Sequence, residues 1–185
     1  LTIPFQGRME VQGEAIMHLS DLEKYNRTAK EPLKNARNAC AGALRNLDTG
    51  VTAARNLDAY FYNVGYIEGK QFATHTEMIE FLKKNRFKVN EFERLYDSLE
   101  GVLEGIREAE ANRHQLDFLI DGMVIKVDDF ALREQMGYTE RFPRWAIAYK
   151  FAAEEMTTRI LDILWDVGRT GRLTPTALVE EVEIG

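Results

Sequence analysis

The segment Ile120–Val127 (IDGMVIKV) restricts the fold of this chain more than any other stretch, because its β-branched run predicts a buried strand that contains a lysine. Lys126 shares one face of that strand with Gly122 and Val124. A lysine in such a position costs free energy unless its charge is paired or it lines a polar cavity. The alternative is an edge strand from which Lys126 points into solvent.

A carboxylate stands close to this lysine in the sequence. Asp121 lies five positions before Lys126 and therefore falls on the opposite face of a regularly pleated strand. Both side chains can reach one site if the backbone departs from regular pleating, which Gly122 makes possible.

A second lysine ends another predicted strand, Trp145–Phe151 (WAIAYKF). Ala146, Ala148 and Lys150 share one face of it. Two alanines beside a cation form a shallow floor that suits a flat ligand carrying a phosphate. Equally, the small face can pack on a helix and leave Lys150 at an exposed strand end.

Polar groups also line a strand predicted at Arg8–Met17. Apolar and polar residues alternate there, so that Glu10, Gln12 and Glu14 share one face. These residues belong either to a site or to an ordinary solvated sheet face.

The segments 33–47 and 57–65 add arginines and aromatic rings. The first predicts a helix rich in small residues, with Arg37 and Arg45 placed to fork onto a phosphate or to stay as surface arginines. The second predicts a strand in which Tyr62 stacks on a base or packs in the core. The apolar stripe predicted for the helix comprises Leu33, Cys40, Leu44 and Leu47.

The remaining elements mix helices and strands without a regular βαβ rhythm, which indicates an α+β fold with antiparallel sheets. Ser20 is the predicted N-cap of a short helix, and Thr74 or Thr76 of another. The further predicted elements are a strand at 87–89, a helix at 93–112 with an apolar stripe through Leu95, Leu99, Val102, Leu103 and Ile106, a helix at 130–136, and strands at 160–167 and 173–182. A change of pattern near 152–158 predicts a domain boundary.

Composition excludes several classes of protein. The chain has 185 residues and a formal net charge of −6, which disfavours a general polyanion binder but permits a local basic groove. Cys40 is the single cysteine, so the chain holds neither a disulfide framework nor a four-thiolate zinc site. No apolar run approaches the ~20 residues of a membrane-spanning helix. We therefore expect a cytoplasmic protein with no membrane partner.

Taken in order, six motifs closely resemble those of the bacterial NAD-dependent DNA ligases. They are VQGE, NARNACAGALRNLD, YFYNVG, IDGMVIKV, PRWAIAYKF and VGRTGRLTP, and they span nearly the whole chain. The resemblance implies a nucleotidyltransferase (adenylation) domain at 1–153 that lacks its N-terminal part. The first strands of an OB-fold β-barrel would follow at 154–185.

Such enzymes seal nicks in duplex DNA with NAD and Mg²⁺ through lysine–AMP and DNA-adenylate intermediates. The resemblance gives catalytic roles to Lys126, Lys150, Asp121 and Arg37, with Asp121 also as the Mg²⁺ ligand. Cofactor binding would fall to Glu14 at the ribose, Tyr62 at the adenine, Arg113, and the two lysines at the α-phosphate. DNA binding would fall to Arg45, Arg169 and Arg172.

Three departures from the family pattern bear on activity. Ala36 stands where the family has proline, and Gln12 where it has arginine. The nucleophile's K-x-D-G motif is absent, so we expect an internal fragment that does not self-adenylate. The zinc finger and other downstream modules would lie outside this segment. The parent enzyme is expected to be a monomer, whereas the fragment is expected to self-associate or to be partly disordered near an open sheet edge.

Two other functions are compatible with the sequence. One is a truncated relative that binds nucleotide or DNA without catalysis. The other is a different nucleotidyltransferase, such as an RNA ligase or capping enzyme, against which the RNACAGALR helix and the VGRTG-LTP run argue.

Overall fold

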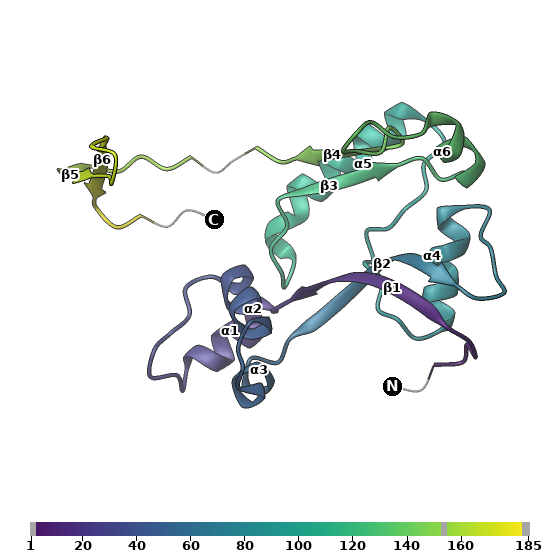
Figure 1. The fold of residues 1–185 in the computed structure, drawn as a ribbon, viewed down its shortest axis with the longest axis horizontal. Helices are drawn as coiled ribbons and strands as arrows, with labels where there is room; N and C mark the ends of the chain where they lie inside the picture. Colours follow the sequence, from purple (N-terminus) through teal and green to yellow (C-terminus); the bar gives the residue numbers. More distant parts are fainter. Residues whose placement is uncertain (1–2, 153–154, 183–185) are drawn as a thin grey trace. The chain divides into compact units, whose positions relative to one another are not determined.

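The computed structural model describes residues 3–152 and 155–182. The chain divides into two compact units, Leu1–Lys150 and Phe151–Gly185 (Figure 1). The domain boundary predicted between residues 153 and 154 falls on residues outside the described part of the chain.

The first unit combines helices with two antiparallel strand pairs, as expected for an α+β fold. Strand β1 pairs with β2 and strand β3 with β4, so the sheets in the described residues are small two-stranded pairs. In chain order the elements are β1 (Met9–Ile16), α1 (Leu19–Asn26), α2 (Ala36–Leu44), α3 (Thr49–Ala54), β2 (Asp58–Ile67), α4 (His75–Lys84), α5 (Leu99–Asn112), a 3₁₀ turn (Arg113–Gln115), β3 (Gly122–Lys126), α6 (Phe130–Met136) and β4 (Ala146–Lys150).

Helices pack against the β1–β2 pair at two small hydrophobic cores. Helices α1, α2 and α3 gather near one end of the pair, and α4 lies near the other (Figure 1). At the first end Met17 packs on the small residues Ala36, Ala39 and Cys40 of α2. At the second, Met78, Ile79 and Leu82 of α4 pack on the strands. Small residues on α2 allow its backbone to approach its neighbours closely.

Half of the apolar stripe predicted for α2 is confirmed, because Cys40 is buried and Leu33 packs against the same core, and the other half is wrong. Leu44 is 62% exposed and Leu47 is fully exposed, whereas the buried face consists of three alanines and Cys40. Helical spacing alone placed Leu44 and Leu47 on the predicted apolar stripe, but α2 ends at Leu44 and Leu47 lies beyond it.

Several helix boundaries also differ from the predictions. Helix α5 begins at Leu99 after the N-cap Ser98, not at residue 93, and Leu95, Leu99 and Leu103 of its predicted stripe are exposed. Thr74 caps α4, as predicted. Helix α3, capped by Asp48, was missed. The segment 87–89 forms no strand, although Lys88 accepts a backbone hydrogen bond from Phe61.

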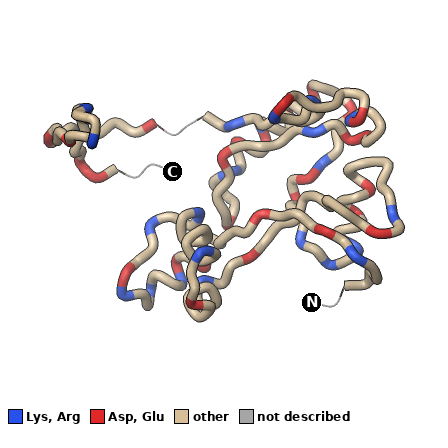
Figure 2. The backbone as a smooth tube through the Cα atoms, in the orientation of Figure 1, with Lys and Arg blue, Asp and Glu red and all other residues tan. Residues whose placement is uncertain are grey.

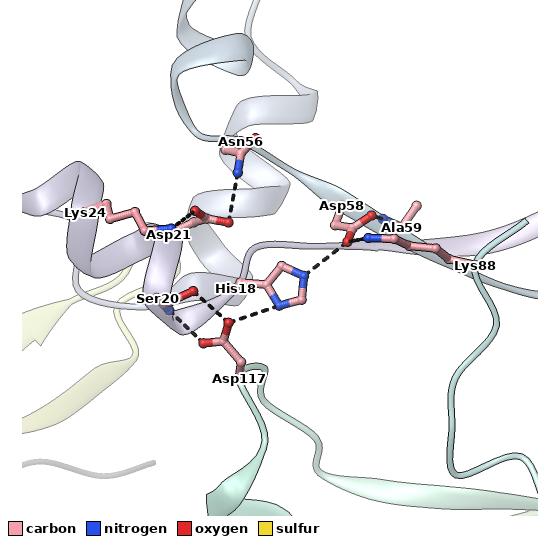
Figure 3. Close-up of polar contacts among 9 residues, drawn as sticks. All are labelled: His18, Ser20, Asp21, Lys24, Asn56, Asp58, Ala59, Lys88 and Asp117. Atoms are coloured by element: carbon pink, nitrogen blue, oxygen red, sulfur yellow. Dashed lines mark hydrogen bonds and ion pairs between the residues drawn. The ribbon is translucent and has the colours of Figure 1, made fainter. Parts of the chain in front are cut away.

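The cap of α1 comes from a distant part of the chain (Figure 3). Ser20 is not the N-cap, because the helix begins at Leu19 and His18 occupies the N-cap position. The carboxylate of Asp117 instead accepts hydrogen bonds from the Ser20 amide (2.8 Å) and hydroxyl (2.7 Å). The backbone carbonyl of Asp117 accepts from Leu19 N–H at 2.8 Å. This contact ties the segment that leads into β3 to α1.

The second unit consists of an antiparallel hairpin, β5 (Ile160–Val167) and β6 (Leu173–Val179). Both strands match the predicted segments closely, although β6 ends three residues earlier. Every residue of the two strands is exposed. Within the described residues of the chain, no helix is both long and apolar enough to cross a membrane.

Candidate nucleotide site

The antiparallel β3–β4 pair places both lysines on one face. Gly122 pairs with Lys150, and Lys126 pairs with Ala146. Directly opposite residues of antiparallel strands project to the same side, so the two lysines share a face with Val124 and Ala148. Four residues of strand separate the two ends of this face, about 13 Å. The face therefore carries a small-residue floor with a cation at each end.

Gly122 allows the two strands to approach closely at one end of this floor. A Cβ atom at Gly122 would lie 2.2 Å from the backbone oxygen of Tyr149 and 3.0 Å from the Cα of Lys150. Those distances are too short for any side chain, so the close approach requires glycine.

Asp121 reaches the lysine face because it lies just before β3, outside the regular pleat. Its carboxylate accepts hydrogen bonds from Lys150 Nζ (2.9 Å) and from Arg37 Nη1 (3.4 Å) of α2. The Lys150 hydrogen bond, together with Arg37, lowers the pKa of Asp121 although partial burial opposes the change. The three residues form an exposed cluster of two cations and one anion.

At the other end of the face, Lys126 lies over an aromatic ring. Its Nζ atom is 5.3 Å from the centroid of Tyr62. Burial lowers the pKa of Lys126. Of the two alternatives left open by the sequence, a solvated edge lysine does not fit this half-buried position.

Tyr62 projects from an irregular point of β2. The β1–β2 register passes from Gln12–Asn63 to Gly13–Phe61 and leaves Tyr62 as the extra residue of a bulge. A Cβ atom at Gly13 would lie 2.7 Å from the backbone oxygen of Tyr60, so this bulge requires the glycine of the VQGE segment. The ring is partly exposed and available for stacking.

Glu93 acts on Lys126 and His75 contacts Glu93, and neither residue was singled out from the sequence. Glu93 interacts electrostatically with Lys126, and the Glu93 carboxylate contacts His75 Nε2 at 2.8 Å. The hydrogen bond from His75 lowers the pKa of Glu93 despite partial burial. Because a helix was wrongly predicted from residue 93, the turn that contains Glu93 was missed. In this turn the Glu93 amide donates a hydrogen bond to the carbonyl of Asn90.

The other predicted site residues belong to other elements of the chain. Glu14 is exposed, pairs across the sheet with Tyr60, and acts electrostatically on Cys40. Arg45 is the exposed C-cap of α2. Arg113 is the C-cap of α5, with its Nε atom 3.3 Å from His114. Arg169 and Arg172 lie in or beside the β5–β6 turn of the second unit.

Asp121 does not form a protein-only metal site. The described residues contain no group of three His, Cys, Asp or Glu side chains that could hold a metal ion. Mg²⁺ is commonly bound through one or two carboxylates and substrate phosphates, so Asp121 alone fits a metal that a phosphate ligand brings with it.

The two groups of contacts suit a ligand with a flat ring and a phosphate. Along the described residues, acidic and basic positions are interspersed and form no continuous basic block (Figure 2). An aromatic ring can stack on Tyr62, and a phosphate can meet an ammonium or guanidinium group. These features fit the class of nucleotide-binding domains.

The chain belongs to the family of NAD-dependent DNA ligase adenylation domains. Residues 1–154 match that family. A protein named DNA ligase from Alkaliphilus metalliredigens is 58% identical over 184 residues, and one from Alkaliphilus oremlandii is 55% identical over 185. Each alignment covers this whole chain and 28% of the relative. A DNA ligase from Finegoldia magna is 57% identical, over 96% of this chain and 27% of that protein.

Proposed function

We propose that this chain is the AMP-binding part of a DNA ligase that uses NAD to seal nicks in duplex DNA. The observation that carries the proposal is the β3–β4 face, where Lys126 beside Tyr62 and Lys150 beside Asp121 and Arg37 stand at the two ends of one floor. The whole chain spans about 28% of the curated relatives' length, so the activity belongs to a longer protein.

The reaction in this proposal has three transfers at phosphorus. A lysine amine attacks the adenylyl phosphorus of NAD, a P–N bond forms, and nicotinamide mononucleotide leaves. An oxygen of the 5′-phosphate at the nick then attacks that phosphorus and releases the lysine. Finally the 3′-hydroxyl attacks the 5′-phosphate, the phosphodiester forms, and AMP leaves. Each step concentrates negative charge on phosphate oxygens.

The residues of this chain would bind the nucleotide and neutralise the charge of its phosphate. Tyr62 stacks on the adenine, Glu14 and Arg113 bind near the nucleotide, and Lys126 and Lys150 offset charge on the α-phosphate. Asp121 holds Lys150 in place through one ion pair and is itself paired with Arg37. Mg²⁺, held by Asp121 together with phosphate oxygens, would supply further charge neutralisation.

The second unit would open an OB-fold that binds the phosphate backbone of DNA through Arg169 and Arg172. Arg45 of the first unit would also bind DNA. This assignment rests on the family resemblance and on the antiparallel hairpin β5–β6. We further propose roles in replication and repair, a cytoplasmic location and a monomeric parent enzyme, with any zinc site outside this segment.

The decisive test uses the full-length protein that contains this segment. We expect it to seal a nicked duplex with NAD and not with ATP. Lys126→Met and Lys150→Met should each slow sealing by roughly 100-fold or more, the scale of losing one charge-stabilising group. Lys34→Met removes an exposed lysine from the loop before α2 and is the matched control. A full-length protein without NAD-dependent sealing would overturn the proposal.

A second measurement concerns the segment itself. Because no K-x-D-G motif occurs in it, the 185-residue chain incubated with NAD and Mg²⁺ should keep its mass. A stable gain of one AMP would show that another residue acts as the nucleophile.

A further inference from the structure

Arg133 is a buried cation that has no role in the proposed function. Among the described residues it is the one lysine, arginine, aspartate or glutamate that is buried, with 8% of its surface exposed. It lies on α6, between the IDGMVIKV and PRWAIAYKF segments, and belongs to neither. Because burying a charge costs free energy, an arginine at this position requires a physical explanation.

The guanidinium group of Arg133 contacts both strands at one end of the β3–β4 pair. Its Nε atom donates a hydrogen bond to the backbone carbonyl of Val127 at 2.5 Å. Its Cζ atom lies 4.3 Å from the centroid of the Trp145 ring and 4.6 Å from that of Phe130. Val127 and Trp145 are also joined directly, because the Val127 amide donates to the Trp145 carbonyl at 2.9 Å. Arg133 therefore joins the two strands at the same level.

This level of the strand pair is the one next to Lys126. Lys126 is the last residue of β3 and pairs with Ala146, so Val127 and Trp145 are the next residues beyond that pair. The end of an isolated two-stranded pair opens readily, because such a pair is marginally stable in water. The contacts of Arg133 oppose that opening beside Lys126.

The helix that carries Arg133 is itself anchored. The Phe130 amide donates to the carbonyl of Ala73 at 3.0 Å. Just before α6, Asp128 Oδ1 accepts hydrogen bonds from the amide and the hydroxyl of Thr76, both at 2.8 Å. Thr76 belongs to α4, which contributes one of the two hydrophobic cores. Arg133 is therefore supported by packed structure on the side away from the strands.

An apolar side chain could fill the same space but could not make both contacts. A planar guanidinium group lies on a ring face while an N–H in its plane donates to a carbonyl, and an ammonium group cannot do both. The arrangement has a cost, because Arg133 Nη2 and Trp145 Nε1 are buried without a hydrogen-bond partner among the described residues. The two contacts that offset this cost both act on the strand ends beside Lys126.

We propose that Arg133 is a positioning residue that holds Lys126 above Tyr62 by joining the ends of β3 and β4. Lys126 Nζ lies 5.3 Å from the centroid of the Tyr62 ring, and both residues belong to the candidate nucleotide site. Arg133 acts through Lys126 and not on the nucleotide. That the position of Lys126 matters for AMP rests on the proposed function, whereas the position itself does not.

The ring of Tyr62 provides a signature of this position, because a ring current moves the NMR signals of groups above the ring upfield. In the 185-residue chain with ¹³C-labelled lysine, Lys126→Met identifies the Lys126 signal, and Tyr62→Leu shows where that signal lies without the ring. We expect Arg133→Met to move the Lys126 signal towards its place in Tyr62→Leu. Arg141→Met, at an exposed arginine between α6 and β4, is the matched control and should not move it. An unmoved Lys126 signal in Arg133→Met would overturn the inference.

Two further variants separate positioning from a general loss of structure. Arg133→Lys keeps the positive charge but cannot make both contacts, so it should also displace the Lys126 signal. If Arg133→Met does not fold, Trp145→Leu removes the ring contact from β4 and should have the same effect. The amide signals of α4 should stay in place in each variant, because the α4 core is not changed. A Lys126 signal that Arg133→Lys leaves unmoved, or that moves only together with the α4 amides, would contradict the inference.

Nick sealing by the full-length protein separates this inference from the proposed function. Arg133→Met should slow sealing roughly 10- to 100-fold, the scale of misplacing a group by about 1 Å. In a Lys126→Met background the same change should cause no further loss, because the two residues act as one unit. Sealing as fast as in Arg141→Met would contradict the inference. A displaced Lys126 signal, in a protein that does not seal nicks with NAD, would count against the proposed function alone.

Discussion

At the scale of single residues, glycines determine the geometry of the candidate site. Gly122 lets the backbone of β4 approach β3, so that Asp121 meets Lys150. Gly13 admits the bulge that carries Tyr62. Both positions exclude a side chain because a backbone oxygen, which cannot move away by rotating about a bond, occupies the space.

Gly122→Ala should therefore destabilise the first unit by about 1–3 kcal/mol, the usual cost of forcing a group into occupied space. The fluorescence of Trp145, which precedes β4, would report urea unfolding in a Trp165→Phe background. Val124→Ala changes an exposed residue of the same strand and should alter the unfolding free energy by about 0.5 kcal/mol or less. Equal midpoints for Gly122→Ala and the parent chain would show that the β3–β4 pair can relax around a methyl group.

At the scale of elements, a polar clamp joins three segments that are distant in the sequence (Figure 3). His18, the N-cap of α1, contacts Asp58 of β2 at 3.1 Å and Asp117 before β3 at 3.5 Å. Asp58 also pairs with Lys88. Because β2 carries Tyr62 and the Asp117 segment leads to Asp121, the clamp positions the elements that carry both halves of the candidate site.

This clamp should weaken in acid. Burial alone would raise the pKa of Asp58, but hydrogen bonds from Lys88 and His18 outweigh it and lower the pKa to about 2 from an ordinary 3.8. A lowered pKa in the folded state contributes stability above about pH 4, and that contribution is lost as the pH falls towards 2.

Asp58→Asn should cost about 1–2 kcal/mol of unfolding free energy at pH 7, with the difference from the parent chain shrinking towards pH 2. Urea unfolding at several pH values measures this, and Glu31→Gln in an exposed loop is the control. A difference that stays constant with pH would assign the loss to packing and not to the carboxylate charge.

The sequence predicted the strands of the site better than its helices and its supporting contacts. The segments IDGMVIKV and WAIAYKF predicted β3 and β4, because alternation and β-branching are local properties. The long-range cap of α1 by Asp117 and the contact of His75 with Glu93 join residues 97 and 18 positions apart. Such contacts depend on how elements pack, and local spacing does not show them. For this reason the N-cap predicted at Ser20 from local spacing was wrong.

At the scale of the whole molecule, much apolar surface remains uncovered within each unit. Val124, Ile147 and Tyr149 of β3–β4 are exposed, as are Trp165 and Leu178 of β5–β6. An isolated two-stranded hairpin is marginally stable in water, whereas the β1–β2 pair has helices packed on it. We therefore expect the free energy of local opening to differ between elements, and we expect the exposed strands to pair with other copies of the chain.

Amide hydrogen exchange of the 185-residue chain, combined with sedimentation at several concentrations, tests this expectation. Amides of α4 around Met78 and Leu82, which are almost fully buried, should exchange most slowly, and those of β5–β6 should exchange fastest in dilute solution. Raising the concentration should shift the sedimentation coefficient upward and slow exchange in β3–β4 or β5–β6, because pairing between copies covers the open edges. A monomer at every concentration, with β3–β4 and β5–β6 as protected as α4, would contradict the prediction. That result would mean that each of these strand pairs is stabilised by contacts within its own chain, beyond the strand pairs and small cores described above.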